Sequence, residues 1–152
     1  MAGILGRVWC TLYIGGRKNA EVVCEGPYSM VRNPLYVFST VAAAGVGAQT
    51  GSILVALIFM AGCALAFSIV IRREERHLSG LFGEDYRAYL ESVPRFLPDP
   101  RLFSDRPLLT APSGRLYRTL GDGLMFLVAI PAFEMVEHLQ GVADLPVLVR
   151  LY

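Results

Sequence analysis

A long uncharged stretch in the first half of the chain limits most strongly how this sequence can fold. From Asn33 to Ile71 there is no Asp, Glu, Lys, Arg or His. An α-helix needs about 20 apolar residues to cross the hydrocarbon core of a bilayer, and this stretch is about twice that length. Its middle, residues 45–52, is rich in glycine and other small residues that favour a bend. The pattern predicts a transmembrane helical hairpin over 34–71, with limbs at about 34–48 and 52–71.

The composition favours a membrane protein and excludes several other classes. Hydrophobic residues make up 54% of the chain, charged residues 18%, and the mean hydropathy is +0.47. A net charge of +1 supplies no concentrated basic field for binding nucleic acid. Cys10, Cys24 and Cys63 are far apart and form no C-x-x-C pair, so we expect neither a disulfide scaffold nor a metal site. We expect one all-α domain over 1–152, a polytopic membrane helical bundle.

The basic residues predict the orientation of this bundle. A hairpin that crosses twice returns the chain to the side it left, so residues 15–33 and 72–118 should face the same compartment. Most of the 14 Lys and Arg residues lie in these two segments. Cytoplasmic loops carry an excess of Lys and Arg, which makes this face cytoplasmic. We therefore expect an integral protein of the inner (plasma) membrane or of an endomembrane.

The two ends of the chain are predicted to be helical as well. The apolar run at the start of residues 1–14 is too short for the core of a signal peptide. This segment instead looks like the end of an N-terminal membrane helix. Residues 116–140 contain an uncharged run that is short for a free span, so we predict one membrane or interfacial helix there. Glu134 and His138 are four residues apart and could hold a metal, but Gly141 just beyond them favours a helix C-cap.

A glycine pattern in the predicted bend resembles a nucleotide-binding loop. Gly45, Gly47 and Gly51 imitate the spacing of a dinucleotide loop, yet such a loop must follow a β-strand and begin a helix. Here the glycines lie between two membrane segments. We favour small residues that let helices approach closely around a bend.

The hairpin should bring together two segments that carry the strongest chemistry. One runs from Gly26 to Tyr36 and places Arg32 and Tyr36 four residues apart on one helix face; the other is Arg72-Arg-Glu-Glu-Arg-His77. Loss of hydration at a membrane interface makes the adjacent carboxylates Glu74 and Glu75 unfavourable unless a cation or a hydrogen-bond donor meets them. Two interpretations remain open here. The pair either receives a cationic ligand or belongs to a charged helix end, in which the cations are Arg72, Arg73 and Arg76.

These segments also resemble a known family. Gly-Pro-Tyr, Arg-x-Pro-x-Tyr, the apolar hairpin and then Arg-x-Glu-Glu-x-x-Leu-x-x-x-Phe-Gly-x-x-Tyr-x-x-Tyr-x-x-x-Val-Pro-Arg follow one another with intact spacing from Gly26 to Pro98. This compound pattern strongly resembles the isoprenylcysteine carboxyl methyltransferases and their phospholipid methyltransferase relatives. The resemblance implies an integral membrane enzyme that carries a methyl group from S-adenosyl-L-methionine to a lipophilic acceptor at the cytoplasmic face of the lipid bilayer. An isoprenylcysteine-like carboxyl group is the acceptor we expect.

The resemblance also implies where the cofactor and the acceptor bind. The donor carries a cation, hydroxyls and an adenine, which call for carboxylates, aromatic faces and backbone polar groups in one pocket. Residues 72–98 would form a cytoplasmic cofactor segment, and Arg73 or Arg95 would place an acceptor carboxylate. The resemblance and the residues assign no catalytic base. The expected cofactor-binding residues are Glu21, Val22, Val23, Tyr28, Arg32, Asn33, Pro34, Leu35, Tyr36, Glu74 and Glu75.

The sequence departs from the family in two respects. The family usually has histidine at the position of Asn33, and an asparagine can hydrogen-bond there but cannot titrate near neutral pH. The resemblance also implies that one or more of the N-terminal helices that precede this core in the family are missing or reduced here, which leaves open a weakened enzyme or one that depends on a homo-oligomer. Two rivals also remain: a membrane NADPH-dependent sterol-type reductase, and a non-catalytic membrane interaction module derived from a methyltransferase.

Overall fold

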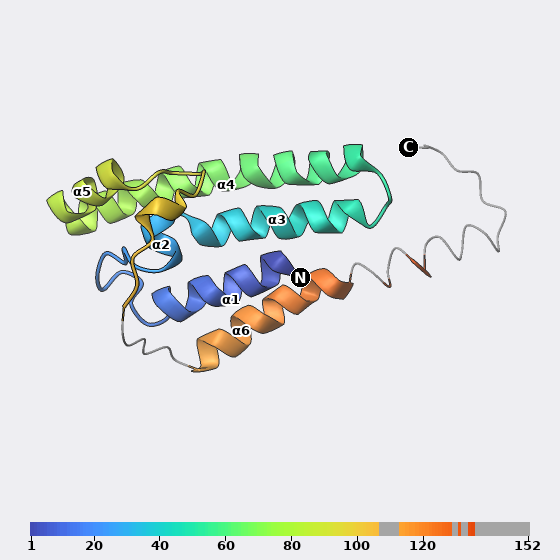
Figure 1. The fold of residues 1–152 in the computed structure, drawn as a ribbon, viewed down its shortest axis with the longest axis horizontal. Coiled ribbons are helices and arrows are strands. Elements are labelled where there is room, and N and C mark those ends of the chain that lie inside the picture. Colours follow the sequence, from blue (N-terminus) through green and yellow to red (C-terminus); the bar gives the residue numbers. More distant parts are fainter. Residues whose placement is uncertain (107–112, 129–130, 132–133, 136–152) are drawn as a thin grey trace.

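The computed structural model describes residues 1–106, 113–128, 131 and 134–135, and the described part of the chain is helical with no β-strand. Four longer helices lie in a row, in the spatial order α6, α1, α3 and α4 (Figure 1). Two short helices, α2 and α5, lie at one end of the row. The bounds are α1 Ala2–Ile14, α2 Pro27–Met30, α3 Pro34–Ala48, α4 Ile53–Phe82, α5 Glu84–Ser92 and α6 Ser113–Leu124.

Helices α3 and α4 are antiparallel and lie side by side. Pro34 occupies the first turn of α3, where its missing N–H is not needed, and α3 ends at Ala48 as predicted. The Ser52 hydroxyl accepts from the Val55 N–H at 3.4 Å and begins α4. α4 passes the predicted limit at Ile71 and continues to Phe82. The charged residues after Ile71 are good helix formers, so α4 ends only at Gly83, whose φ is +56°.

One described helix is long and apolar enough to cross a membrane. This helix is α4, with 30 residues, and most of its apolar side chains are exposed rather than packed inside the molecule. The apolar helices α1 and α3 have 13 and 15 residues, fewer than the roughly 20 that a full crossing needs. The fold is therefore all-helical and membrane-like, while the second crossing and the polytopic bundle stay predictions.

Helix α1 lies between α3 and α6. Gly6 leaves no room for a side chain because the ring of Phe38 from α3 lies against it. On the other side, the Thr11 hydroxyl donates to the Thr119 hydroxyl of α6 at 3.0 Å. The helix predicted over 116–140 begins at Ser113 and runs to Leu124, a 3-10 helix follows at Met125–Val128, and the described residues 131 and 134–135 are again α-helical. His138 and Gly141, with most of residues 129–140, lie outside the described residues.

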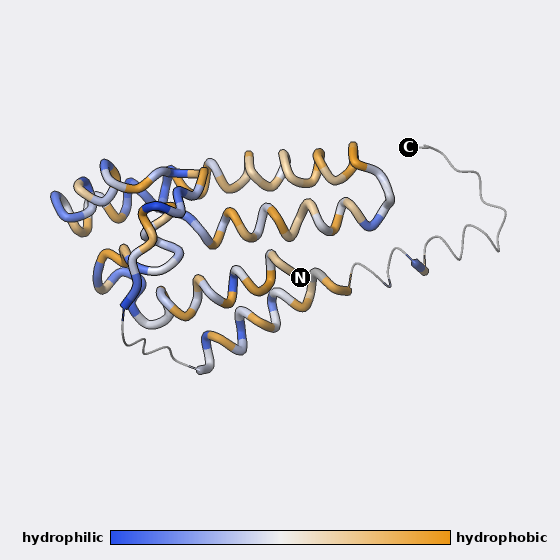
Figure 2. The backbone as a smooth tube through the Cα atoms, viewed as in Figure 1, coloured by the Kyte–Doolittle hydropathy of each residue, from blue (hydrophilic) through white to orange (hydrophobic). Residues whose placement is uncertain are grey.

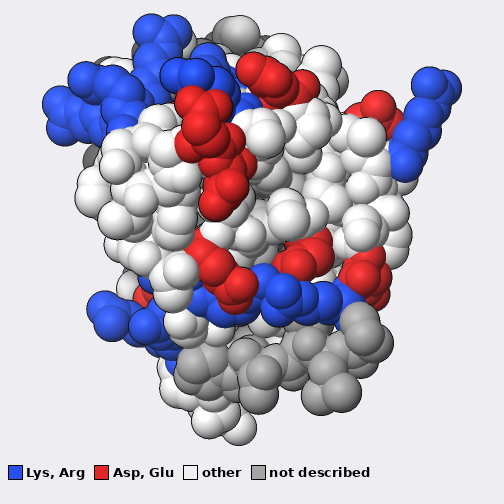
Figure 3. All heavy atoms as spheres, turned by 90° about the vertical axis from the view of Figure 1, so that its left-hand side faces the viewer, with Lys and Arg blue, Asp and Glu red and all other residues white. Residues whose placement is uncertain are grey.

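The polar segments gather at one end of the row. Residues 15–33 and 72–106 meet there, and hydrophilic residues concentrate in the same region (Figure 2). Viewed end-on, this face carries both basic and acidic side chains (Figure 3). The segment after α5 crosses α2, where the Gly26 N–H donates to the Ser104 carbonyl at 2.7 Å and the Asp99 N–H to the Met30 carbonyl at 3.0 Å. These bonds tie α2 to the segment that follows α5.

Candidate functional site

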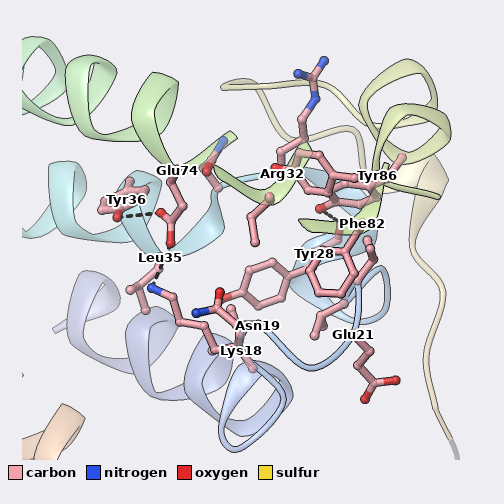
Figure 4. A pocket seen from close by; sticks show the side chains of 16 residues that line it. Lys18, Asn19, Glu21, Tyr28, Arg32, Leu35, Tyr36, Glu74, Phe82 and Tyr86 are labelled. Atoms are coloured by element: carbon pink, nitrogen blue, oxygen red, sulfur yellow. Dashed lines mark hydrogen bonds and ion pairs between the residues drawn. The ribbon is translucent and has the colours of Figure 1, made fainter. Parts of the chain in front are cut away.

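A cavity open to solvent lies at this polar end (Figure 4). Its walls come from the end of α1, the loop that follows, α2, the start of α3, the last third of α4, and α5. The lining residues are Ile14, Lys18, Asn19, Glu21, Val22, Val23, Tyr28, Arg32, Asn33, Leu35, Tyr36, Glu74, Leu78, Phe82, Tyr86 and Tyr89.

Glu74 is the acidic group inside the cavity with polar partners on two sides. Lys18 Nζ lies 2.8 Å from its Oε1, and the Tyr36 hydroxyl donates to its Oε2 at 2.9 Å (Figure 4). The Glu74 side chain keeps 24% of its surface exposed. Both carboxylate oxygens therefore have partners, and one of these partners is a flexible cation.

Tyrosines form much of the opposite wall. Tyr28, Tyr86 and Tyr89 are buried, and the Tyr89 hydroxyl donates to the Tyr28 carbonyl at 2.8 Å. Burial raises the pKa of Tyr86 to about 12 and raises the pKa values of Tyr28 and Tyr89 as well. At neutral pH these hydroxyls remain protonated. The wall offers neutral donors and aromatic faces, the groups that suit a planar or cationic ligand.

Asn33 contributes an unpartnered polar group at the start of α3. It is the N-cap residue, but its side chain makes no capping hydrogen bond, and its buried Nδ2 has no hydrogen-bond partner within the described residues. An unpartnered buried amide is unfavourable in a folded protein unless a ligand or water completes it. Because Asn33 also lines the cavity, a bound ligand is a natural acceptor for this N–H₂ group.

Glu75 faces a different environment from its neighbour. Its side chain is buried, and both of its oxygens are bound by arginines: Arg95 Nη2 lies 2.7 Å from Oε2, and Arg32 Nη1 lies 3.3 Å from Oε1. Arg32 also donates from Nε to the Val93 carbonyl at 2.6 Å. We call Glu75, Arg32 and Arg95 the arginine clamp. It joins α4 to the start of α3 and to the segment after α5.

The structure brings nine of the eleven expected cofactor-binding residues to the cavity. Pro34 is buried in the first turn of α3, and Glu75 belongs to the arginine clamp, so neither lines the cavity. Arg32 contributes its stem only, since its guanidinium points away from the cavity (Figure 4). Glu21 lies at the rim with its carboxylate turned outward, where the Arg17 guanidinium donates to it and lowers its pKa.

The expected acceptor-binding arginines lie elsewhere. Arg95 is bound to Glu75, and Arg73 is exposed on α4; neither lines the cavity. The charged-helix-end interpretation also named the wrong cations. Within the described residues, Glu74 and Glu75 pair with Lys18, Arg32 and Arg95, and not with Arg72, Arg73 or Arg76.

Several lining residues were not predicted as site residues. A four-residue spacing places Glu74, Leu78 and Phe82 on one face of α4, a signal that the sequence contains. Tyr86 and Tyr89 continue this wall from α5. Lys18 and Asn19 had no such periodicity, because they lie in the turns after α1. The described residues contain no cluster of three or more His, Cys, Asp or Glu that could hold a metal ion.

Comparison with known proteins gives this site a family context. Residues 4–85 match the family model described as phospholipid methyltransferase. The nickel-cobalt-cadmium resistance protein NccN of Alcaligenes xylosoxydans xylosoxydans is 41% identical over 88% of this chain and 64% of its own length. The cobalt-zinc-cadmium resistance protein CzcN of Cupriavidus metallidurans is 37% identical over 86% of this chain and 62% of its own.

A protein with a named methyltransferase activity is a more distant relative. The protein-S-isoprenylcysteine O-methyltransferase of Schizosaccharomyces pombe is 31% identical over 56% of this chain and 37% of its own length. The chain thus spans a little under two thirds of the two metal-resistance relatives. No solved structure matches it.

Proposed function

The chain belongs to the phospholipid methyltransferase family, and we propose that it transfers a methyl group from S-adenosyl-L-methionine to a lipophilic acceptor at the polar end of the bundle. The observation that carries this proposal is the cavity itself. It joins a carboxylate, a wall of neutral tyrosines and an unpartnered buried amide beside apolar helices.

The residues present fit the proposed donor. Glu74 can accept hydrogen bonds from a cationic amino group, and the Asn33 N–H₂ can donate to a ligand oxygen or nitrogen. The rings of Tyr28 and Tyr86 can lie against a purine or a cationic sulfur. The backbone of Glu21–Val23 can meet the edge of the base. When bound, the donor would supply an electrophilic methyl group on a positively charged sulfur.

The lining favours a carboxylate as the acceptor. An amine or a thiol must lose a proton before attack, which calls for a general base. Among the described lining residues there is no histidine or cysteine, Tyr28, Tyr86 and Tyr89 hold their protons at neutral pH, and the inward-facing carboxylate, Glu74, is assigned to the donor. A carboxylate is already a nucleophile and needs only to be placed. We therefore propose an isoprenylcysteine-like carboxyl group over an amine.

In such a reaction the protein itself mainly orients the donor and the acceptor. Holding two reactants in line can contribute about 7 to 11 kcal/mol, and this requires fixed walls rather than an acid or a base. The arginine clamp and the bonds of the 93–106 segment fix the walls of α2, α3 and α4. The exposed apolar side chains of α4 suit contact with the bilayer, from which a lipophilic acceptor would enter.

Calorimetric titration of detergent-purified protein tests the proposal. S-Adenosylmethionine and S-adenosylhomocysteine should bind, whereas NADPH should not. Binding of NADPH alone would favour a reductase, and binding of none of the three would favour a non-catalytic membrane module. Titration with Zn²⁺ and Cd²⁺ under the same conditions tests whether the chain binds metal ions, because two relatives are named for metal resistance.

The orientation of the bundle forms a second part of the proposal. Cys24 is exposed in the loop after α1, at the polar end, while Cys10 is buried. Cys24 and an Arg101→Cys substitution should both react with a membrane-impermeant maleimide from the cytoplasmic side only. Cys24→Ser supplies the background. Labelling of the two positions from opposite sides would contradict the proposed topology.

A further inference from the structure

Lys18 is placed where a cationic ligand of Glu74 would bind. Its Nζ lies 2.8 Å from Glu74 Oε1, inside the cavity (Figure 4). If Glu74 receives the amino group of the donor, the ligand's ammonium and Lys18 compete for the same carboxylate. The other oxygen of Glu74 is already bound by the Tyr36 hydroxyl.

The Lys18 side chain can leave this position easily. It is 53% exposed and comes from the turns after α1. Its ammonium can therefore reach water by rotation of its own side-chain bonds, without movement of a helix. A partly exposed ion pair of this kind is weak, so a ligand cation can replace it.

The choice of residue type supports the same conclusion. Lys18 is the sole lysine among 14 basic residues, the others being arginines. Neighbouring Glu75 is bound by two arginines, one of them through two nitrogens, Nε at 3.2 Å and Nη2 at 2.7 Å. A planar guanidinium grips a carboxylate in this two-pronged way, whereas an ammonium is a single charge on a flexible stem. The cavity thus has the cation that is easier to displace.

We propose that Lys18 is a displaceable counter-ion, which pairs with Glu74 in the free protein and is replaced by the cationic amino group of the bound donor. The proposal rests on the proposed function. It makes Lys18 a specificity-determining residue. Glu74 never stands unpaired at the membrane interface, and only a ligand that brings its own cation can take the carboxylate.

Lys18→Met tests this by removing the competitor while keeping the apolar stem. The affinity for S-adenosylmethionine and S-adenosylhomocysteine should rise about twofold to fivefold, the range of a partly exposed ion pair. The affinity for 5′-methylthioadenosine, which lacks the amino-acid part of the donor and so its cationic amino group, should not change. Lys18→Arg should lower the affinity for the first two ligands, because a guanidinium is harder to displace. Arg76→Met, which removes an exposed cation on α4, is the matched control and should change nothing.

Two further measurements distinguish failure of the Lys18 proposal from failure of the proposed function. In a Glu74→Gln background, Lys18→Met should no longer alter affinity. Without any ligand, Glu74→Gln should speed the acylation of Lys18 by an amine-reactive reagent, read by mass spectrometry. Equal affinities of the natural protein and Lys18→Met would overturn the inference alone. If none of the three ligands binds to the natural protein or to any variant, the proposed function is overturned and this inference with it.

Discussion

Two adjacent carboxylates on α4 have opposite environments. Glu74 faces the cavity, keeps 24% of its side chain exposed and meets a lysine and a tyrosine. Glu75 is buried, and two arginines bind both of its oxygens. Successive helix positions point about 100° apart, so one residue step separates a carboxylate that lines the cavity from one held in the arginine clamp. The difference indicates that the cavity's acid is held loosely while the wall behind it is fixed.

The largest expected effect is a loss of stability when the arginine clamp is broken. Glu75→Gln leaves Arg32 and Arg95 without a counter-charge, and removing one partner of a buried pair typically costs 3 to 5 kcal/mol. Arg95 is 41% exposed and can turn toward water, so we expect the lower end, a loss of about 3 kcal/mol of unfolding free energy. Thermal unfolding in detergent measures it. Glu84→Gln breaks an exposed pair with Arg87 and should change little, which makes it the control.

A stability loss in Glu75→Gln no greater than that in Glu84→Gln would remove the distinction between the two carboxylates. A selective loss of donor affinity in folded Glu75→Gln protein would also remove the distinction, because it would mean that Glu75 contacts the ligand.

The reverse pattern is expected for Glu74. Glu74→Gln should weaken S-adenosylmethionine binding by about 1.5 kcal/mol, the lower end for a charged hydrogen bond, because the natural protein gives up the Lys18 pair on binding. Stability should hardly change, since that pair is partly exposed. Titration calorimetry together with thermal unfolding checks both parts. Unchanged affinity in a folded variant would make Glu74 a structural residue like its neighbour.

Part of this contrast could be predicted from the sequence. The uncharged run, Pro34 and the glycine-rich bend predicted a helix at about 34–48, where α3 lies. The family resemblance put Glu74 and Tyr36 among the residues of one cofactor site. The end of α4 was missed because the membrane boundary, which the charges mark, does not end a helix, whereas Gly83 does. Glu75 was assigned to the cofactor because adjacency in sequence does not show which elements cover each face of α4. The cations were missed for the same reason, since Arg95 and Lys18 reach α4 only through tertiary packing.

A smaller effect is expected at Asn33, on the cavity side. Asn33→Ala should weaken donor binding by about 0.5 to 1.5 kcal/mol, the value of a neutral hydrogen bond. Stability should be kept, because the side chain makes no capping bond to α3. Asn33→His should keep binding and make it pH-dependent near 6.5, the usual histidine pKa. If Asn33→Ala binds as tightly as the natural protein, the unpartnered Nδ2 does not meet the donor.

At neutral pH the smallest effect is expected at Tyr86, which lies between the two regions. Burial raises its pKa to about 12, the charges of Glu75 and Glu74 add to this, and Arg32 and Arg95 oppose it. An unfolded tyrosine loses its proton near pH 10. Between about pH 10 and 12 the unfolded state therefore holds fewer protons than the folded state, and stability falls as pH rises, by at most about 1.4 kcal/mol per pH unit from this residue.

Tyr86→Phe should therefore make the loss of stability above pH 10 shallower without abolishing it, because Tyr28 and Tyr89 also have raised pKa values. At pH 7 to 8 the variant should match the natural protein, since the Tyr86 hydroxyl makes no hydrogen bond within the described residues. Unfolding followed by the fluorescence of Trp9, the single tryptophan, gives both profiles. Parallel profiles above pH 10 would mean that Tyr86 ionises as easily in the folded protein as in water, and that the field of the two carboxylates does not reach this wall of the cavity.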